Sequence, residues 1–89
     1  MEIDAIANEA AELIGGDRKE YGDFRSNLDL CGVLWSRYLE SKHGLEYDLS
    51  GHDVAMLMVL LKASRVASGQ FKKDNYVDIC GYASIAGAF

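Results

Sequence analysis

The sequence predicts an all-α fold, a compact bundle of about four helices, and three observations support this. The chain contains no proline, the residue that breaks helix interiors. Apolar residues recur at steps of three and four along most of the chain, which is the spacing of one helix face. Polar stretches that contain glycine separate these segments and are typical of loops. Residues 1–89 are therefore expected to form a single all-helical domain.

Two helices are expected in the first half of the chain. Residues 3–14 show the amphipathic spacing, and Gly15 ends this helix together with the glycine that follows it. A polar connection covers residues 17–23. The next apolar series begins at Phe24 and closes near His43, which predicts a second helix between these residues.

Two further helices are expected in the second half. Ser50 and Asp53 have the S-x-x-D spacing of a capping box, so a third helix should cover residues 51–68. Its segment 54–61 is apolar on nearly every face, which predicts that this helix is central and the most buried. Asp74 is expected to cap a fourth helix that continues to the last residue.

Charge and composition restrict the partners. The net charge of −5 argues against general nucleic-acid binding, because that binding requires a positive surface that displaces counterions. Residues 1–50 carry a net charge of −6 and residues 51–89 a net charge of +1, so an anionic partner should meet the second half. Hydrophobic residues make up 49% of this short chain, which favours a homo-oligomer that completes its core across subunits.

The cysteines and the apolar runs predict a location in the cytoplasm. Cys31 and Cys80 lie in apolar patterns without metal-ligand spacing and are expected to be buried free thiols in a reducing compartment. The N-terminus lacks the basic start of a signal peptide. The longest apolar run, residues 54–61, is far shorter than the ~20 residues that span a bilayer, so no membrane partner is predicted.

A charged set on the last two helices is the most function-like feature. Lys62 and Arg65 share one helix face, and Asp74 and Asp78 share another, with Tyr82 one turn further on. The short intervening loop predicts antiparallel neighbouring helices, which would place the two pairs near each other. In one interpretation the cations hold phosphate oxygens while the carboxylates hold Mg²⁺ or accept from a base or sugar hydroxyl. In the other, the four residues form salt bridges with each other.

A second candidate segment precedes the second helix. Arg18 offers a fork of hydrogen-bond donors, and the glycine after Tyr21 lets the backbone turn or approach a ligand closely. The alternative is an ordinary charged loop. Asn27, just inside the second helix, is either a local backbone partner or a site residue. Neither histidine has a second ligand at zinc-site spacing, so a zinc site is not predicted.

The ordered series DRKEYGDFRSN, LWSRYL, DVAMLMVLLKASRVASG and DNYVDICGYASI resembles a family of short proteins from tailed phages and prophages, described as a domain of unknown function. The resemblance covers roughly residues 11–86 and implies the cytoplasm of the host cell as the location. More distantly, the YG turn, the K-x-x-R helix and the D-x-x-x-D helix resemble phage nucleotide-modification-associated domains and the all-α NTP pyrophosphatases.

The pyrophosphatase resemblance implies two acidic pairs that hold Mg²⁺ against a triphosphate. This sequence departs from that pattern, because the helix that should carry the first pair has only Asp53. Asp53, Asp74 and Asp78 could together hold one ion, whereas hydrolysis with several metal ions does not fit. Binding without turnover fits the residues at least as well.

Three functional hypotheses follow. In the first, the chain binds a nucleotide or nucleotide-derived signal and sequesters it to counter host defence, using Arg18, Tyr21, Asn27, Lys62, Arg65, Asp74, Asp78 and Tyr82. In the second, it is a Mg²⁺-dependent nucleotide pyrophosphatase. In the third, it is a small protein that binds and inhibits a host factor, which its acidic first half and its size would suit.

Overall fold

Four helices form the part of the chain that the computed structural model describes, residues 2–15 and 23–89. The helices are α1 (Ile3–Gly15), α2 (Phe24–His43), α3 (Gly51–Ser68) and α4 (Lys73–Gly87). No strand occurs in these residues, which confirms the all-α prediction. None of the described helices is long and apolar enough to cross a membrane.

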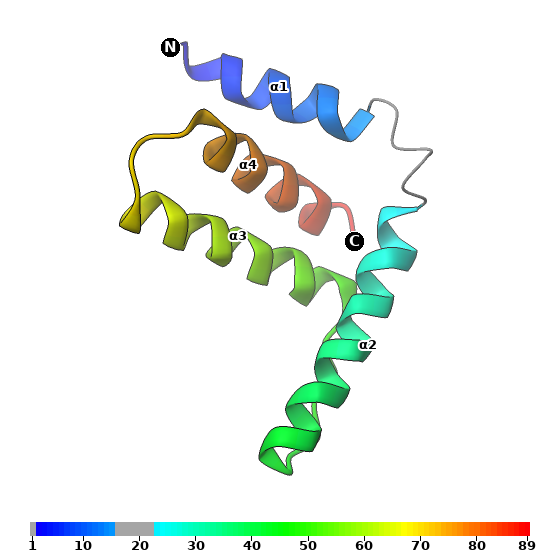
Figure 1. Ribbon diagram of the computed structural model, residues 1–89. Helices are drawn as coiled ribbons and strands as arrows, with labels where there is room; N and C mark the ends of the chain where they lie inside the picture. Colours follow the sequence, from blue (N-terminus) through cyan, green and yellow to red (C-terminus); the bar gives the residue numbers. More distant parts are fainter. Residues whose placement is uncertain (1, 16–22) are drawn as a thin grey trace.

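Three of the helices lie side by side in one row, with α4 between α1 and α3 (Figure 1). α2 crosses the end of this row near the start of α3, and the rest of α2 extends away from the other helices (Figure 1). The central helix of the row is therefore α4, whereas the sequence predicted that it would be α3.

The prediction that the apolar run of α3 is the most buried segment is wrong for this chain by itself. Only Val54 and Ala55 of that run are buried. Four of its other side chains are 39–62% exposed, namely Met56, Leu57, Leu60 and Leu61. The reason is geometric, because α4 covers one side of α3 along its length while α2 meets α3 only near its beginning.

Small side chains dominate the buried core. The buried hydrophobic residues among those described are Ala10, Val54, Ala55, Val77, Ile85 and Ala86. The two cysteines are free thiols as predicted, but both are only partly buried. Partial burial raises the pKa of the Cys31 thiol.

Local caps fix where the helices begin and end. Asp23 caps α2 by accepting from the N–H of Arg25, and Gly44 ends α2 with a φ of 72°, a left-handed conformation that glycine adopts without strain. The predicted capping box at α3 is present, since Ser50 accepts from the N–H of Asp53 and the Asp53 carboxylate accepts from the N–H of Ser50. In contrast, α4 begins one residue before Asp74, so the prediction that Asp74 caps it is wrong. The carbonyl of Lys72 accepts from the N–H of Asn75, and this bond closes the first turn.

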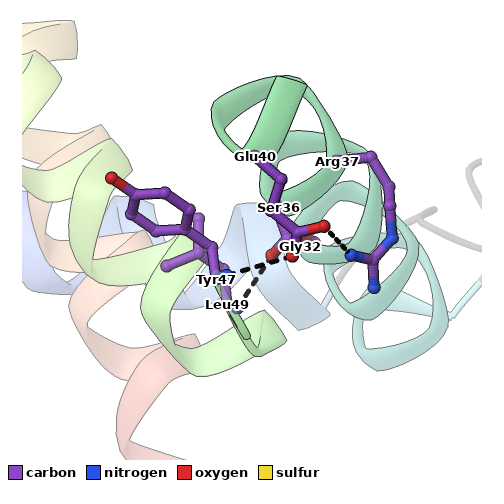
Figure 2. A network of polar contacts seen from close by, with 6 residues as sticks. All are labelled: Gly32, Ser36, Arg37, Glu40, Tyr47 and Leu49. Atoms are coloured by element: carbon purple, nitrogen blue, oxygen red, sulfur yellow. Dashed lines mark hydrogen bonds and ion pairs between the residues drawn. The ribbon is translucent and has the colours of Figure 1, made fainter. Parts of the chain in front are cut away.

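The connection between α2 and α3 runs back along α2 and is held by side-chain hydrogen bonds (Figure 2). Ser36 Oγ donates to the carbonyl of Gly32 at 2.7 Å and accepts from the N–H of Leu49 at 2.9 Å. The Glu40 carboxylate accepts from the N–H of Tyr47 at 3.0 Å and also binds Arg37. These bonds fix residues 44–50 against α2 and so set the direction in which α3 leaves.

Candidate functional site

The antiparallel packing of α3 against α4 brings one predicted pair of opposite charges together. Lys62 Nζ lies 2.9 Å from Asp78 Oδ2, and the Lys62 side chain is only 14% exposed. This contact matches the salt-bridge interpretation for these two residues. Because both charges are already paired, neither is placed to meet a ligand without breaking the bridge.

The next turn of α3 carries Arg65 past this bridge to the level of Asn75 on α4. There the end of α3, the connection and the start of α4 line an open pocket of about 340 Å³. Its lining residues are Arg65, Ser68, Gly69, Gln70, Lys72 and Asn75. The described residues of this lining include two basic groups and no acidic group, so their charge favours an anion.

Among the described residues, no acid pairs with the cations that line this pocket. Lys73 is paired instead, with its Nζ 2.6 Å from Glu9 Oε2 of α1, and this hydrogen bond raises the pKa of Lys73. Within residues 2–15 and 23–89, neither Arg65 nor Lys72 forms an ion pair. The arrangement leaves a guanidinium and an ammonium beside one pocket, both able to bind phosphate or carboxylate oxygens.

Two features of α4 add to the polarity of the pocket. Lys72 is the N-cap of α4 and offers no side-chain hydrogen bond to the first turn, where backbone N–H groups and the helix dipole favour an anion. Asn75 lines the pocket with a residue only 9% exposed, so an amide is held nearly out of solvent beside the two cations. Sequence reasoning missed Lys72 and Asn75 as site residues. The adjacent lysines Lys72 and Lys73 at the start of the helix were the available indication.

Asp74, Asp78 and Tyr82 do not line this pocket. Asp74 is exposed in the first turn of α4, where an acid complements the helix dipole. Asp78 and Tyr82 line a different cavity of about 60 Å³ between α1 and α4. That cavity is far below the roughly 300–1,000 Å³ of a small-molecule site. Arg65 and Asp74 are not paired, so the predicted four-residue set is divided.

The three acids predicted as metal ligands do not lie together either. Asp53 lies in the first turn of α3, at the opposite end of that helix from Arg65, and its carboxylate is used in the capping box. The hydrogen bond from the N–H of Ser50 is the main reason that the pKa of Asp53 is lowered. No group of three acids, histidines or cysteines in the described ranges could hold a metal ion, so Asp53, Asp74 and Asp78 do not fit one Mg²⁺.

The remaining predicted site residues lie elsewhere. Arg18 and Tyr21 are outside the residues that the structure describes. Asn27 is in the first turn of α2, where its N–H donates to the carbonyl of Asp23 at 3.0 Å. This end of α2 contacts the end of α4, because Arg25 donates to the carbonyl of Ala88. Asn27 is therefore about the length of α4, roughly 20 Å, from the pocket beside Arg65.

Comparison with known proteins places the chain among phage proteins, as its sequence motifs suggested. Residues 5–89 match a family model described as a domain of unknown function (DUF6378). The "Gene 55 protein" of Mycobacterium phage L5 is 38% identical over 82 residues, which are 91% of this chain and 49% of that protein. The "Gene 55 protein" of Mycobacterium phage D29 is 40% identical over 81 residues, 90% of this chain and 50% of that protein. The chain thus spans about half the length of these relatives. No solved structure matches it.

Proposed function

Because the chain belongs to the phage protein family described as a domain of unknown function (DUF6378), whose description assigns no activity, we propose a function from its site. The chain binds the phosphate group of a nucleotide or nucleotide-derived signal in the pocket beside Arg65 and Lys72. It holds this ligand without hydrolysing it, in the cytoplasm of the host cell, and so removes it from a host defence response.

One observation supports this proposal above the others: in the part of the chain that the structure describes, the pocket is lined by two cations that form no ion pair and by no acid. Charge-assisted hydrogen bonds from Arg and Lys are among the strongest contacts available to phosphate oxygens. The pocket volume of about 340 Å³ is within the roughly 300–1,000 Å³ range of small-molecule sites. The Asn75 amide and the Gln70 side chain supply neutral donors and acceptors that suit a base or sugar.

Binding without hydrolysis follows from where the carboxylates lie. Phosphoryl-transfer sites use acids to hold Mg²⁺ against the phosphates. Here Asp78 is paired with Lys62, Asp53 caps α3, and neither lines the pocket. The pyrophosphatase alternative predicts release of pyrophosphate or phosphate when Mg²⁺ or Mn²⁺ is added to a panel of nucleotides. We expect no release in that assay.

Calorimetry against mono-, di-, tri- and cyclic nucleotides, with inorganic pyrophosphate as the minimal probe, tests the proposal. Arg65→Gln and Lys72→Gln should each weaken binding by roughly 10- to 100-fold, because each removes a charged hydrogen bond to the ligand. Arg37→Gln and Lys42→Gln are matched controls on α2, and both should leave the affinity unchanged.

Two outcomes would contradict the proposal. In the first, neither pyrophosphate nor any nucleotide in the panel binds, which would favour the alternative that the chain inhibits a host protein. In the second, a nucleotide binds but the Arg65 and Lys72 variants bind it as tightly as the α2 controls do. That result would place the ligand elsewhere on the chain.

A further inference from the structure

α2 and α3 each carry a stripe of exposed apolar side chains. On α2 the stripe follows helical spacing, with residues that are 49–63% exposed, namely Leu30, Val33, Leu34 and Tyr38. On α3 it consists of Met56, Leu57, Leu60 and Leu61. No charged residue occurs between positions 54 and 61. We call these eight residues, two stripes on contacting helices, the α2–α3 apolar surface.

The exposed area of the chain is larger than a folded monomer of its size should have. A monomeric protein of 9.8 kDa exposes about 5,200 Å². This chain exposes 6401 Å². The difference of roughly 1,200 Å² exceeds the ~800 Å² that each partner buries in a standard stable interface.

The arrangement of the helices contributes to this exposed area. Folded domains bury their apolar faces between at least two layers of secondary structure. Here α1, α4 and α3 form a single row, and α2 leaves that row instead of covering it (Figure 1). The part of the chain that the structure describes therefore supplies one layer of helices, and no second layer covers the apolar side of α3.

We infer that two copies of this chain associate through the α2–α3 apolar surface, each supplying the layer that the other lacks. A two-fold interface uses the same patch on both copies, so the patch must be self-complementary. The run 54–61 of α3 carries no charge, and Arg37 is the one charged residue between Leu30 and Tyr38 of α2, so like charges do not oppose this surface on two copies. The inference does not depend on the phosphate pocket, which lies at the opposite end of α3 from α2.

In the longer relatives, a different segment is available to cover the α2–α3 apolar surface. About half of each mycobacteriophage protein lies outside the matched region, and that additional segment could cover the same surface within one chain. The excess area of this chain is already of the size that a dimer of two such chains buries, so a second copy is sufficient. A second copy doubles the mass in solution, whereas a covering segment of the same chain leaves a monomer.

Sedimentation equilibrium of the chain over a range of concentrations tests the inference. We expect twice the chain mass, dissociating on dilution. Leu34→Glu and Leu60→Glu should each weaken association by at least about 100-fold, because each places two charges in a two-fold apolar interface. Ile3→Glu is the matched control, since Ile3 is 98% exposed on α1, on the far side of α4 from α3. It should leave the mass unchanged.

Thermal unfolding keeps the test decisive if a glutamate variant fails to fold. The Tm of the unmodified chain should rise with protein concentration, because dissociation accompanies unfolding of a dimer. A monomeric mass and a Tm independent of concentration would overturn the inference and leave the extra segment of the longer relatives as the occupant. A dimer that both glutamate variants preserve would overturn it as well, because association would then use another surface.

Discussion

The two connections at the ends of α3 differ in how completely their polar groups are used. The connection before α3, residues 44–50, is held by Ser36 and Glu40, and the capping box follows it directly. The connection after α3, residues 69–72, leads into a helix whose N-cap offers no side-chain bond, and it borders the cations of the pocket. Polar groups that are satisfied within the chain stabilise the fold, whereas unsatisfied ones at a pocket are available to a ligand.

This comparison extends to the charged residues of α3 itself. Lys62 is paired with Asp78 and is mostly buried, while Arg65, one turn later, has no acidic partner among the described residues. Substitution of a paired residue such as Lys62 should change the free energy of unfolding. Substitution of a residue at the pocket such as Arg65 should change ligand affinity. Substitutions can therefore test the division directly.

Gly32→Ala should have the largest effect on stability. A Cβ atom at Gly32 would overlap the carbonyl oxygen of Leu49, so the connection would have to move away from α2. The expected loss is about 1–3 kcal/mol in the free energy of unfolding, measured by urea denaturation with the single tryptophan as reporter. Gly87→Ala is the control, because nothing lies within 4 Å of its Cβ position and its stability should be unchanged or higher. Equal effects would mean that the contact at Gly32 is not required.

Ser36→Ala should have the next largest effect. It removes the acceptor for the N–H of Leu49 as well as the donor to Gly32, and the expected loss is about 1–2 kcal/mol. Ser84→Ala provides the comparison, since the exposed Ser84 Oγ donates only to the carbonyl of Cys80 within its own helix. The two variants should be measured in the same urea titration. If they are equally stable, the hydrogen bonds of Ser36 do not hold the connection.

Lowering the pH should weaken the connection between α2 and α3, residues 44–50. Hydrogen bonds from the N–H of Tyr47 and then from Arg37 lower the pKa of Glu40, and those from Ser50 lower the pKa of Asp53. A carboxyl whose pKa is lowered by folding stabilises the native state above its unfolded pKa, about 4, and loses this contribution as the pH falls through the folded value. Stability should therefore decline below about pH 4, and less steeply in Glu40→Gln.

Glu46→Gln serves as the control for this pH dependence, because Glu46 is an exposed acid of the same connection. The measurement is the urea midpoint at a series of pH values. If Glu40→Gln shows the same slope as the unmodified chain, the pH dependence arises from other acids.

Lys62→Met should have the smallest effect. It removes the bridge to Asp78 but keeps an apolar side chain of similar length, so we expect a loss of about 1 kcal/mol or less. Ligand affinity should not change, in contrast to Arg65→Gln. Calorimetry and urea denaturation of both variants separate the two roles. A loss of affinity in Lys62→Met as large as that in Arg65→Gln would mean that the bridge opens to bind the ligand.

Local sequence features were sufficient to predict the helices. The spacing of apolar residues located all four, and Ser50 with Asp53 located the start of α3, because capping depends on residues only three positions apart. The phage resemblance was equally visible, since it rests on ordered motifs along the chain. Asp74 was misplaced as a cap because Lys73 also joins the helix, and its side chain pairs with Glu9 of α1.

Only the tertiary structure decided which faces are covered and which charges are paired. Helical spacing shows that residues 56–61 are apolar, but whether they are buried depends on α2, which leaves the row of helices instead of covering it. In the same way, the register between α3 and α4 pairs Lys62 with Asp78 and leaves Arg65 beside Lys72 at a pocket. The sequence by itself determined the helices and their apolar and charged residues, because those follow from local interactions. Their burial and pairing depend on contacts between distant segments, which local spacing does not contain.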